Sequence, residues 1–412
     1  MTQKINLAGL ELQVLDPNLG AGGQGKAQLV APASDPATKL VLKELPIGPD
    51  TEARVRWLCD QNFTALTPAI AAPIVSELTG HGTILHLASL APGDAQDEAA
   101  PRALPHNLQI CLEFVCLIQR LEEAGIVHGD IAPSNIFIAD DGAVSLIDFD
   151  GFLALDPSVP PPDTIGQRPM LAPEQRNGSA QRPTVESGYF QMAMLMSMIL
   201  TGHYPTEGLP SEPAAVDQLL SQGHWPEHDR TPDPDDLPIN ALGSELVTLF
   251  DQAFSLDPSA RPNPDTWRRA LTRALHNCWV HDCGQAFVAA ATTTQCPGCG
   301  AAVKIPNATK ELKIQILPNG PRYGVEIKNR TPIILGRATM PGLPPTVSGR
   351  HLEILPYQGR LLLRHVGSNP TLIQQNSRWY RISELWLDRV GQSDMIQLML
   401  AESEITLTIE QR

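Results

Sequence analysis

The spacing of apolar residues divides the 412-residue chain into three stretches. The first 90 residues alternate short apolar runs with Gly and Pro, which predicts β-strands, apart from one helical window at residues 51–62. Residues 107–125 place apolar side chains at helical spacing, and helical patterns continue to about residue 275. From residue 312 onward, short alternating segments return with turn residues between them, as in a β-sandwich. The pattern therefore predicts an α+β chain of several domains.

Two segments of the middle stretch refine this prediction. Asp141-Gly142 separates strand-like runs at residues 135–139 and 143–147, which is a strong signal for a β-hairpin. The longest apolar run, residues 190–200, is too short to span a bilayer and predicts a buried helix. Because the first residues also lack the pattern of a signal peptide, we expect a cytoplasmic protein.

The net charge of −15 is unevenly distributed. Residues 301–412 hold 14 Lys and Arg against 9 Asp and Glu, about +5, which leaves about −20 for residues 1–300. The acidic part disfavours nucleic acid as a partner, whereas the basic tail could attract a phosphorylated or acidic ligand.

A glycine-rich segment near the N-terminus carries the first chemical signal. It follows the pattern G-x-G-x-x-G with Gly20, Gly22 and Gly25. Glycine lets backbone N–H groups approach a polyphosphate, but dinucleotide-binding folds use the same pattern to open a helix, whereas strand-like runs follow here. Lys43 lies on the next predicted strand, where its cation can hold the α- and β-phosphates. We expect Lys43 to pair with Glu52, and Glu44 is the poorer candidate because adjacent strand residues point to opposite faces.

A second motif is far more specific. The segment Val127-His128-Gly129-Asp130-Ile131-Ala132-Pro133-Ser134-Asn135 is followed by Asp148-Phe149-Asp150, 13 residues beyond Asn135. In-line phosphoryl transfer needs a carboxylate that orients the attacking hydroxyl and accepts its proton, for which Asp130 is the candidate. It also needs oxygen ligands for magnesium, for which Asn135 and Asp148 are the candidates. These segments resemble the catalytic loop and the Asp-Phe-Gly motif of protein kinases.

Two later segments extend the resemblance to protein kinases over about residues 8–275. Ala172-Pro173-Glu174 lies where kinases close the activation segment, and Arg261 lies in a segment similar to the one whose Arg pairs with that Glu. We therefore expect a buried Glu174–Arg261 pair. The resemblance implies a bilobal kinase-like fold, ATP and Mg as cofactors, and four catalytic residues: Asp130, Lys43, Asn135 and Asp148.

Four positions depart from the kinase pattern. Gly129 replaces an Arg, Ala132 a Lys that supports the γ-phosphate, Asp150 a Gly, and Gly188 an Asp that braces the catalytic loop. These changes keep open a second interpretation, a nucleotide-binding pseudokinase scaffold that recruits phosphorylated partners. The His-Gly-Asp variant also occurs in small-molecule kinases of the aminoglycoside phosphotransferase type, which typically lack Ala-Pro-Glu with its distant Arg.

Four of the seven cysteines lie within 22 residues. They form two pairs separated by 12 residues, Cys278 with Cys283 and Cys296 with Cys299. In a cytosolic chain this spacing predicts a closed tetrahedral zinc site in a small zinc ribbon, with iron as the minority option. Because four cysteines already suffice, we do not expect His281 to be a ligand.

Residues 312–412 resemble an FHA domain, an all-β sandwich whose loops bind phosphothreonine. The matching segments are Leu335-Gly336-Arg337, Val347-Ser348-Gly349-Arg350-His351 and Val366-Gly367-Ser368-Asn369-Pro370-Thr371. The resemblance implies that phosphate is bound by Arg337, Ser348 and Arg350, that His351 braces the loops, and that Ser368 and Asn369 position the ligand. A guanidinium and hydroxyl donors on rigid loops suit a doubly charged phosphate. The alternative is a sandwich that kept the frame and lost its ligand.

We therefore predict a protein kinase-like domain at residues 1–275, a zinc ribbon at 276–304 and an FHA domain at 310–412. The expected function is an ATP-dependent Ser/Thr protein kinase in bacterial signalling, which acts on protein substrates and docks on phosphothreonine-containing proteins, with no nucleic-acid or membrane partner. The arrangement also resembles kinases of bacterial stress or tellurite-resistance gene clusters. That resemblance implies a von Willebrand-type protein and a metal-dependent protein phosphatase as partners.

Overall fold

The chain forms two compact units, Met1–Ile239 with Ser244–Leu271 and Asn240–Gly243 with Thr272–Arg412. The computed structural model describes residues 3–22, 25–46, 48–63, 67, 69–79, 82–95, 103–139, 142–163, 166–205, 213–230, 236–290, 293–303, 309–317, 320–328, 332–357, 360–375, 378–387 and 395–411. Among the helices of these residues, none combines the length and the apolar character needed to cross a bilayer.

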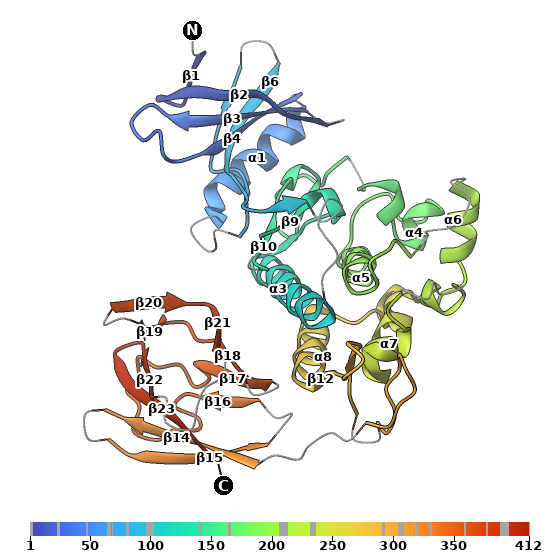
Figure 1. Ribbon diagram of the computed structural model, residues 1–412. Helices are drawn as coiled ribbons and strands as arrows, with labels where there is room; N and C mark the ends of the chain where they lie inside the picture. The colour runs from blue at the N-terminus through green and yellow to red at the C-terminus, as the bar shows by residue number, and fades with distance from the viewer. Residues whose placement is uncertain are drawn as a thin grey trace. The chain divides into compact units, whose positions relative to one another are not determined.

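The first unit begins with an antiparallel sheet of six strands in the order β1-β2-β3-β4-β6-β5 (Figure 1). The strands are β1 Lys4–Leu7, β2 Leu10–Gly22, β3 Gly25–Pro32, β4 Leu40–Pro46, β5 Val75–Leu78 and β6 Thr83–Ser89. Alternate residues such as Leu12, Val30, Leu42 and Leu87 are buried together, as a half-covered sheet requires. Helix α1, Pro49–Gln61, starts with Pro in its first turn. The predicted strands and the helical window at 51–62 are confirmed.

Short strands and turns follow the sheet. Strands β7 (Asp94–Ala95), β9 (Ile136–Ile138) and β10 (Val144–Leu146) form one small sheet, and β8 (Ile126–Val127) pairs with β11 (Leu153–Ala154). The antiparallel β9–β10 pair confirms the predicted hairpin, although Asp141 of its turn lies outside the described residues. Two 3₁₀ turns, η2 Pro133–Asn135 and η3 Phe149–Gly151, carry predicted site residues.

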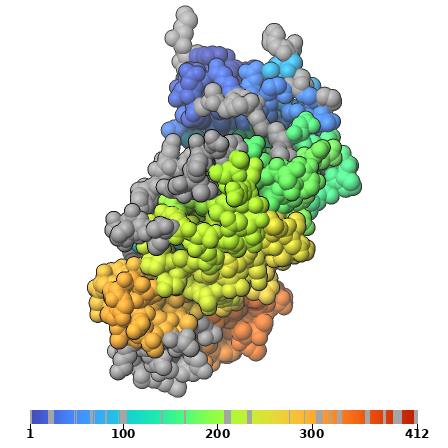
Figure 2. Space-filling model, turned by 90° about the vertical axis from the view of Figure 1, so that its right-hand side faces the viewer, coloured from blue at the N-terminus to red at the C-terminus, as the bar shows by residue number. Residues whose placement is uncertain are grey.

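Helices follow these strands and turns. They are α3 Leu104–Glu123, α4 Pro173–Arg176, α5 Val185–Thr201, α6 Pro213–Leu220, α7 Gly243–Ala253 and α8 Pro264–Asn277. Most of their residues belong to the first unit, although the end of α8 after Leu271 belongs to the second. The predicted helices at 107–125 and 190–200 correspond to α3 and α5, which pack against each other (Figure 1). From Phe190 to Leu200 every residue of α5 is buried. On the face seen in Figure 2, the green and yellow segments of this helical part form a closely packed surface.

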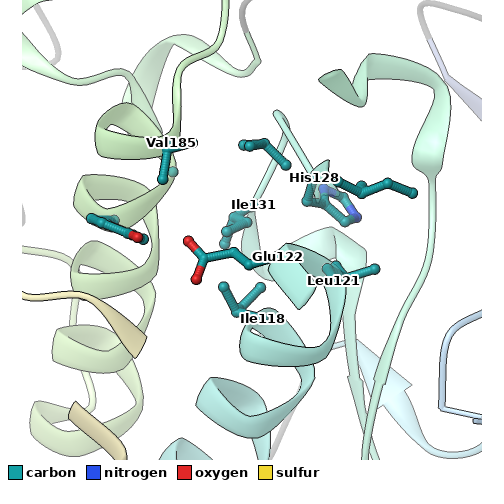
Figure 3. A pocket seen from close by; sticks show the side chains of 10 residues that line it. Ile118, Leu121, Glu122, His128, Ile131 and Val185 are labelled. Carbon is teal, nitrogen blue, oxygen red and sulfur yellow. The ribbon is translucent and has the colours of Figure 1, made fainter. Parts of the chain in front are cut away.

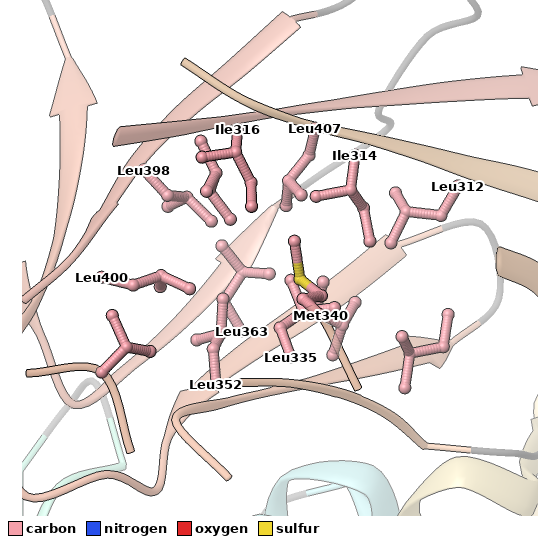
Figure 4. Close-up of a cluster of buried hydrophobic side chains, with 14 of the residues drawn as sticks. Leu312, Ile314, Ile316, Leu335, Met340, Leu352, Leu363, Leu398, Leu400 and Leu407 are labelled. Carbon is pink, nitrogen blue, oxygen red and sulfur yellow. The ribbon is translucent and has the colours of Figure 1, made fainter. Parts of the chain in front are cut away.

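The second unit consists of a small hairpin and a β-sandwich. Strands β12 (Cys278–Val280) and β13 (Ala286–Val288) form the hairpin. One sheet of the sandwich has the order β15-β14-β23-β22-β19-β20 and the other β16-β17-β18-β21. The strands are β14 Thr309–Ile316, β15 Arg322–Lys328, β16 Ile333–Leu335, β17 Leu352–Tyr357, β18 Arg360–His365, β19 Thr371–Gln375, β20 Arg378–Ile382, β21 Glu384–Leu387, β22 Met395–Leu400 and β23 Ser403–Gln411. Leu312, Leu398 and Leu407 of the first sheet lie in one buried cluster with Leu352 and Leu363 of the second (Figure 4).

A buried ion pair closes the helical part of the first unit, as predicted. Arg261 donates from Nη1 to Oε1 and from Nη2 to Oε2 of Glu174, both at 2.7 Å. The same guanidinium donates to the carbonyls of Glu186 at 3.0 Å and Ser255 at 3.3 Å. The Arg261 side chain is fully buried, so removing its partner would leave an uncompensated charge in the core.

We predict that Arg261→Met lowers the free energy of unfolding of the helical part by about 3–5 kcal/mol, because Glu174 is then left without its cation. Urea unfolding followed through the buried Trp225 and Trp267 would measure the change. The exposed Arg120 of α3 provides the control, and Arg120→Met is expected to change stability by no more than about 0.5 kcal/mol. Equal effects of the two substitutions would contradict the structural role of the pair.

Candidate functional site

The predicted glycine-rich segment forms the end of a hairpin beside the strand of Lys43. Gly20 pairs with Ala27 and Gly22 pairs with Gly25 across strands β2 and β3, while Gly23 and Gln24 lie outside the described residues. The next strand, β4, pairs Lys43 with Ala27. The backbone of the glycine-rich segment and the Lys43 ammonium therefore belong to adjacent strands of one sheet.

Both oxygens of the Asp130 carboxylate are held by hydrogen bonds. The Asn135 amide group donates to Asp130 Oδ2 at 3.2 Å and to the Asp130 carbonyl at 2.9 Å. The backbone N–H of Gln167, just before the Ala-Pro-Glu segment, donates to Asp130 Oδ1 at 3.0 Å. Asp130 is half-buried, so its carboxylate is oriented by the catalytic loop and by the activation segment together.

Gly129 allows the catalytic loop to approach the segment after β10 closely. Its φ of +77° belongs to the left-handed region that favours glycine. A Cβ atom at this position would lie 2.1 Å from the carbonyl oxygen of Gly151. The backbone at position 129 thus requires glycine, so the replacement of the kinase Arg has a structural reason besides removing a cation.

Lys43 is held by two carboxylates that follow β10. Its Nζ lies 2.6 Å from Asp148 Oδ1 and also contacts Asp150 Oδ2. The backbone of Asp148 adopts φ +61°, in the left-handed region. The Lys43 side chain is 17% exposed, and its ammonium lies between the sheet and turn η3.

This cluster shifts the pKa of each member. Burial alone would lower the pKa of Lys43, but Asp150 and Asp148 outweigh it and raise that pKa. Burial opposes ionisation of Asp148, yet Lys43 lowers its pKa below the ordinary value. Burial and the neighbouring Asp148 raise the pKa of Asp150 to about 7, although Lys43 opposes the shift. One cation thus stabilises two carboxylates unequally, and the more deeply buried Asp150 is the one that protonates more readily.

The prediction that Lys43 pairs with Glu52 was wrong. Glu52 forms an ion pair at 2.7 Å with Arg56, one turn later in α1, and Glu44 accepts a hydrogen bond from Thr83 at 2.9 Å. The charge of Lys43 is already balanced by Asp148 and Asp150, so it needs no acid from the helix. The sequence did contain a signal for this arrangement, the second acid placed two residues after Asp148.

Gln191 is a functional residue that the sequence did not indicate. Its Oε1 accepts a hydrogen bond from the backbone N–H of Ile131 at 3.2 Å, and its side chain is buried in α5. Gly188, at the position of the expected brace, has no side chain and lies against Val127. A brace therefore exists, but it comes from one helical turn further along α5. An isolated amide within an apolar helix is the feature that could have revealed it.

A small cavity marks the space beside Gly188. It is about 10 Å³ in volume, about the space of one water molecule. Figure 3 shows Ile118 and Leu121 of α3, His128 and Ile131 of the catalytic loop, and Val185 of α5 converging on it. The cavity is too small for a substrate, so its walls act only as packing around the loop.

In the second unit, the structure groups His281 with three of the predicted cysteines. The ligand atoms of His281, Cys283, Cys296 and Cys299 all lie within 4.8 Å of one another. The Sγ atoms of Cys283 and Cys296 are 3.8 Å apart, and His281 Nδ1 is 3.2 Å from Cys283 Sγ and 3.4 Å from Cys299 Sγ. Bond lengths of zinc to sulfur imply a sulfur–sulfur distance of about 3.8 Å in a tetrahedral site. The donor set therefore fits zinc.

The predicted ligand set named Cys278 and left out His281, whereas the structure groups His281 and not Cys278 with the other three cysteines. Cys278 is buried in strand β12, where it pairs with Val288. The turn that projects ligands begins three residues later, since Gly284 N–H donates to the His281 carbonyl at 2.8 Å, and Gly300 N–H donates to the Cys296 carbonyl at 2.9 Å. Each of the two turns thus carries two members of the group, His281 with Cys283 and Cys296 with Cys299.

The loops of the sandwich bring five predicted phosphopeptide residues to one end. Ser348 Oγ lies 3.0 Å from Ser368 Oγ and accepts a hydrogen bond from the Ser368 N–H at 2.9 Å. Asn369 donates to the Thr346 carbonyl at 2.7 Å, and Arg337 Nε donates to the Val347 carbonyl. Arg350 is exposed in the same loop, with its Nη2 4.0 Å from Glu353.

His351 lies beneath these loops. It is fully buried and its Nδ1 accepts a hydrogen bond from the backbone N–H of Ser348 at 3.2 Å. A Cβ atom on Gly367 would approach both the His351 ring and Ser348 Oγ within 3 Å. The imidazole thus supports the loop of Ser348, which leaves the exposed Arg337 and the two serine hydroxyls to face solvent.

Comparison with known proteins identifies the family. The protein kinase domain family matches residues 75–280, half of the chain. The serine/threonine-protein kinase AfsK of Streptomyces coelicolor is 25% identical over 277 residues, which cover 65% of this chain and 32% of that protein. The serine/threonine-protein kinase D of Synechocystis is 24% identical over 291 residues, which cover 65% of this chain and 53% of that protein. The chain thus spans between about a third and about half of these relatives. It belongs to the protein kinase family.

Proposed function

We propose that this chain is a Ser/Thr protein kinase that uses ATP and magnesium and carries a metal-binding module and a phosphothreonine-binding domain. The observation that carries the proposal is that two residue pairs, Lys43 with Asp148 and Asn135 with Asp130, adjoin each other, since the backbone N–H next to Asp148 donates to the Asn135 carbonyl at 3.0 Å. Lys43 contacts Asp148 at 2.6 Å, and Asn135 contacts Asp130 at 3.2 Å. The relatives named as Ser/Thr kinases support the choice of hydroxyl acceptor.

The residues present suit Mg-ATP. The Asn135 amide nitrogen is engaged by Asp130, so Asn135 Oδ1 and an Asp148 oxygen are the atoms that would hold magnesium, a metal that prefers oxygen ligands. ATP, when bound with magnesium, supplies the phosphoryl group. Lys43 would pair with its phosphates, and the glycine-rich segment Gly20 to Gly25 would present backbone N–H groups to them.

Asp130 is the proposed general base. It would accept the proton of a substrate Ser or Thr hydroxyl, while the Gln167 N–H and the Asn135 amide keep the carboxylate in place. Ala132 offers no cation to the transferred phosphoryl group, which removes one source of transition-state stabilisation. A nucleotide-binding scaffold without turnover is therefore the second candidate function, and Ala132 is the departure that favours it. Gly188 no longer favours it, because Gln191 supplies the brace that Gly188 lacks.

Residues 276–304 are proposed to be a zinc module, and residues 310–412 an FHA domain. The mixed site of one imidazole and three thiolates supports the first proposal. The convergence of Arg337, Ser348 and Ser368 at the end of a β-sandwich supports the second. Iron is the remaining option for the metal, and a sandwich without ligand the remaining option for the domain.

The proposed setting is bacterial signalling in the cytoplasm. Kinase and phosphothreonine-binding domains in one chain suit an enzyme that docks on phosphorylated proteins, including its own products. A von Willebrand-type protein and a metal-dependent phosphatase are proposed as partners on the resemblance of this domain arrangement alone.

We predict that the full chain transfers label from γ-labelled ATP and magnesium to itself or to a co-purified protein. Asp130→Ala should reduce the rate about 100-fold or more, because the attacking hydroxyl loses its base, while nucleotide binding persists. Label incorporation and binding of a fluorescent ATP analogue would be measured on the same preparations. Nucleotide binding without any label transfer by the unchanged chain would favour the scaffold.

We predict that the full chain binds about one zinc ion and that His281 is among the ligands. His281→Ala should lose zinc to a chelator much faster than the unchanged chain, whereas Cys278→Ser should retain the ion. Elemental analysis and the rate of metal release report the difference. Chelation should loosen residues 278–300 and leave the kinase part folded, as hydrogen exchange would record. Retention of zinc by His281→Ala together with loss by Cys278→Ser would restore the four-cysteine set.

We predict that Arg337→Ala weakens binding of a degenerate phosphothreonine peptide library by about 10- to 100-fold, because a charge-assisted hydrogen bond to phosphate is lost. Arg378→Ala, which removes an exposed arginine of β20, is the matched control and should bind as the unchanged chain does. Fluorescence anisotropy with phosphorylated and unphosphorylated libraries measures both. Equal affinity for the two libraries would indicate a sandwich that lost its ligand.

A further inference from the structure

The two carboxylates that hold Lys43 come from one short segment. Asp148 and Asp150 flank Phe149 in turn η3, and both contact the Lys43 ammonium. Their environments differ, because 32% of the Asp148 side chain is exposed against 7% for Asp150. Asp150 also lies 3.8 Å from the buried His86, the residue paired with Lys43 across strands β4 and β6. Asp148 thus faces outward and Asp150 lies behind the cation.

Helix α1 supplies no carboxylate to this cluster. Its Glu52 pairs with Arg56 on the outer side of the helix at 2.7 Å. Its Arg54 donates to the Pro161 carbonyl of the activation segment at 3.1 Å, lines the same cavity as Asp150 and interacts electrostatically with it. This cavity of about 270 Å³ lies between α1 residues such as Val55 and the η3 segment that contains Asp150. The α1 residues that line this cavity include the cation Arg54 and no carboxylate.

We propose that Asp150 is the positioning residue of Lys43 and takes the place of a carboxylate from helix α1. The inference rests on the proposed function, in which Asp148 is a magnesium ligand. Once Asp148 binds metal, only Asp150 remains to hold the ammonium in line with the phosphates. A buried ammonium without a carboxylate is strongly disfavoured. The contact between Asp150 and Lys43 therefore persists when Asp148 exchanges Lys43 for the metal.

The contact between Lys43 and its two carboxylates is made without a carboxylate of α1. The backbone of Lys43 belongs to strand β4, and its ammonium is held by carboxylates at turn η3, which comes shortly after strand β10. Movement of α1 would change the 270 Å³ cavity and the position of Arg54 relative to Asp150, but it would remove no carboxylate from Lys43.

Two isosteric substitutions test the assignment in the full chain. Asp150→Asn removes the charge and keeps the shape, and we expect the Kd and KM for Mg-ATP to rise about 10- to 100-fold. Asp150→Glu should recover part of the loss. Glu52→Gln tests the alternative partner, and it should change both constants by no more than about twofold. Binding is measured with a fluorescent ATP analogue and magnesium, and KM by label transfer.

A double-mutant cycle separates positioning from general loss of structure. In a Lys43→Met background, Asp150→Asn should have almost no further effect on the Kd, because the partner is already absent. Additive effects, or a rise in Kd with Glu52→Gln that equals that of Asp150→Asn, would overturn the proposal. The binding measurement does not need turnover. A chain that binds nucleotide and transfers no label would therefore refute the kinase proposal, but the double-mutant cycle would still test whether Asp150 positions Lys43. A chain that binds no Mg-ATP would refute both.

Discussion

The first unit depends on one ammonium group between two carboxylates. Lys43 is carried by a strand of the sheet, whereas Asp148 and Asp150 follow a strand of the helical part. A largely buried charge needs partners of opposite sign, and here the sheet supplies the cation and the helical part supplies both carboxylates. The ion cluster therefore joins the two halves of the unit. The two acids differ in burial, because Asp148 is partly exposed and Asp150 is buried.

The catalytic loop satisfies a second constraint with unusual residues. Its backbone N–H at Ile131 is buried and needs an acceptor, which Gln191 provides. The base carboxylate needs fixed donors, which come from Asn135 and from the N–H of Gln167. None of these contacts requires the Asp that is absent at position 188. The same geometry can therefore be reached through a different set of side chains.

Much of this architecture could be predicted from the sequence, because apolar periodicity and motif spacing record local structure and chain order. The β9–β10 hairpin, the buried α5 and the Glu174–Arg261 pair belong to this class. The second acid at position 150 hinted at the partner of Lys43, but the choice of Asp150 over Glu52 depends on which way helix α1 faces and on the left-handed backbone at Asp148, which the sequence pattern does not specify. The choice of His281 over Cys278 likewise depends on where a strand ends and a turn begins, which cysteine spacing alone does not specify.

The contact between Gly129 and the Gly151 carbonyl limits which residues position 129 can hold. An arginine at position 129 would need the space that the oxygen now fills, 2.1 Å from its Cβ, so the substitution would displace the whole stretch that follows Asp150. Restoring the common kinase residue would therefore demand a rebuilt activation segment at the same time. A single codon change could not convert this chain into an enzyme switched on by phosphorylation of that segment.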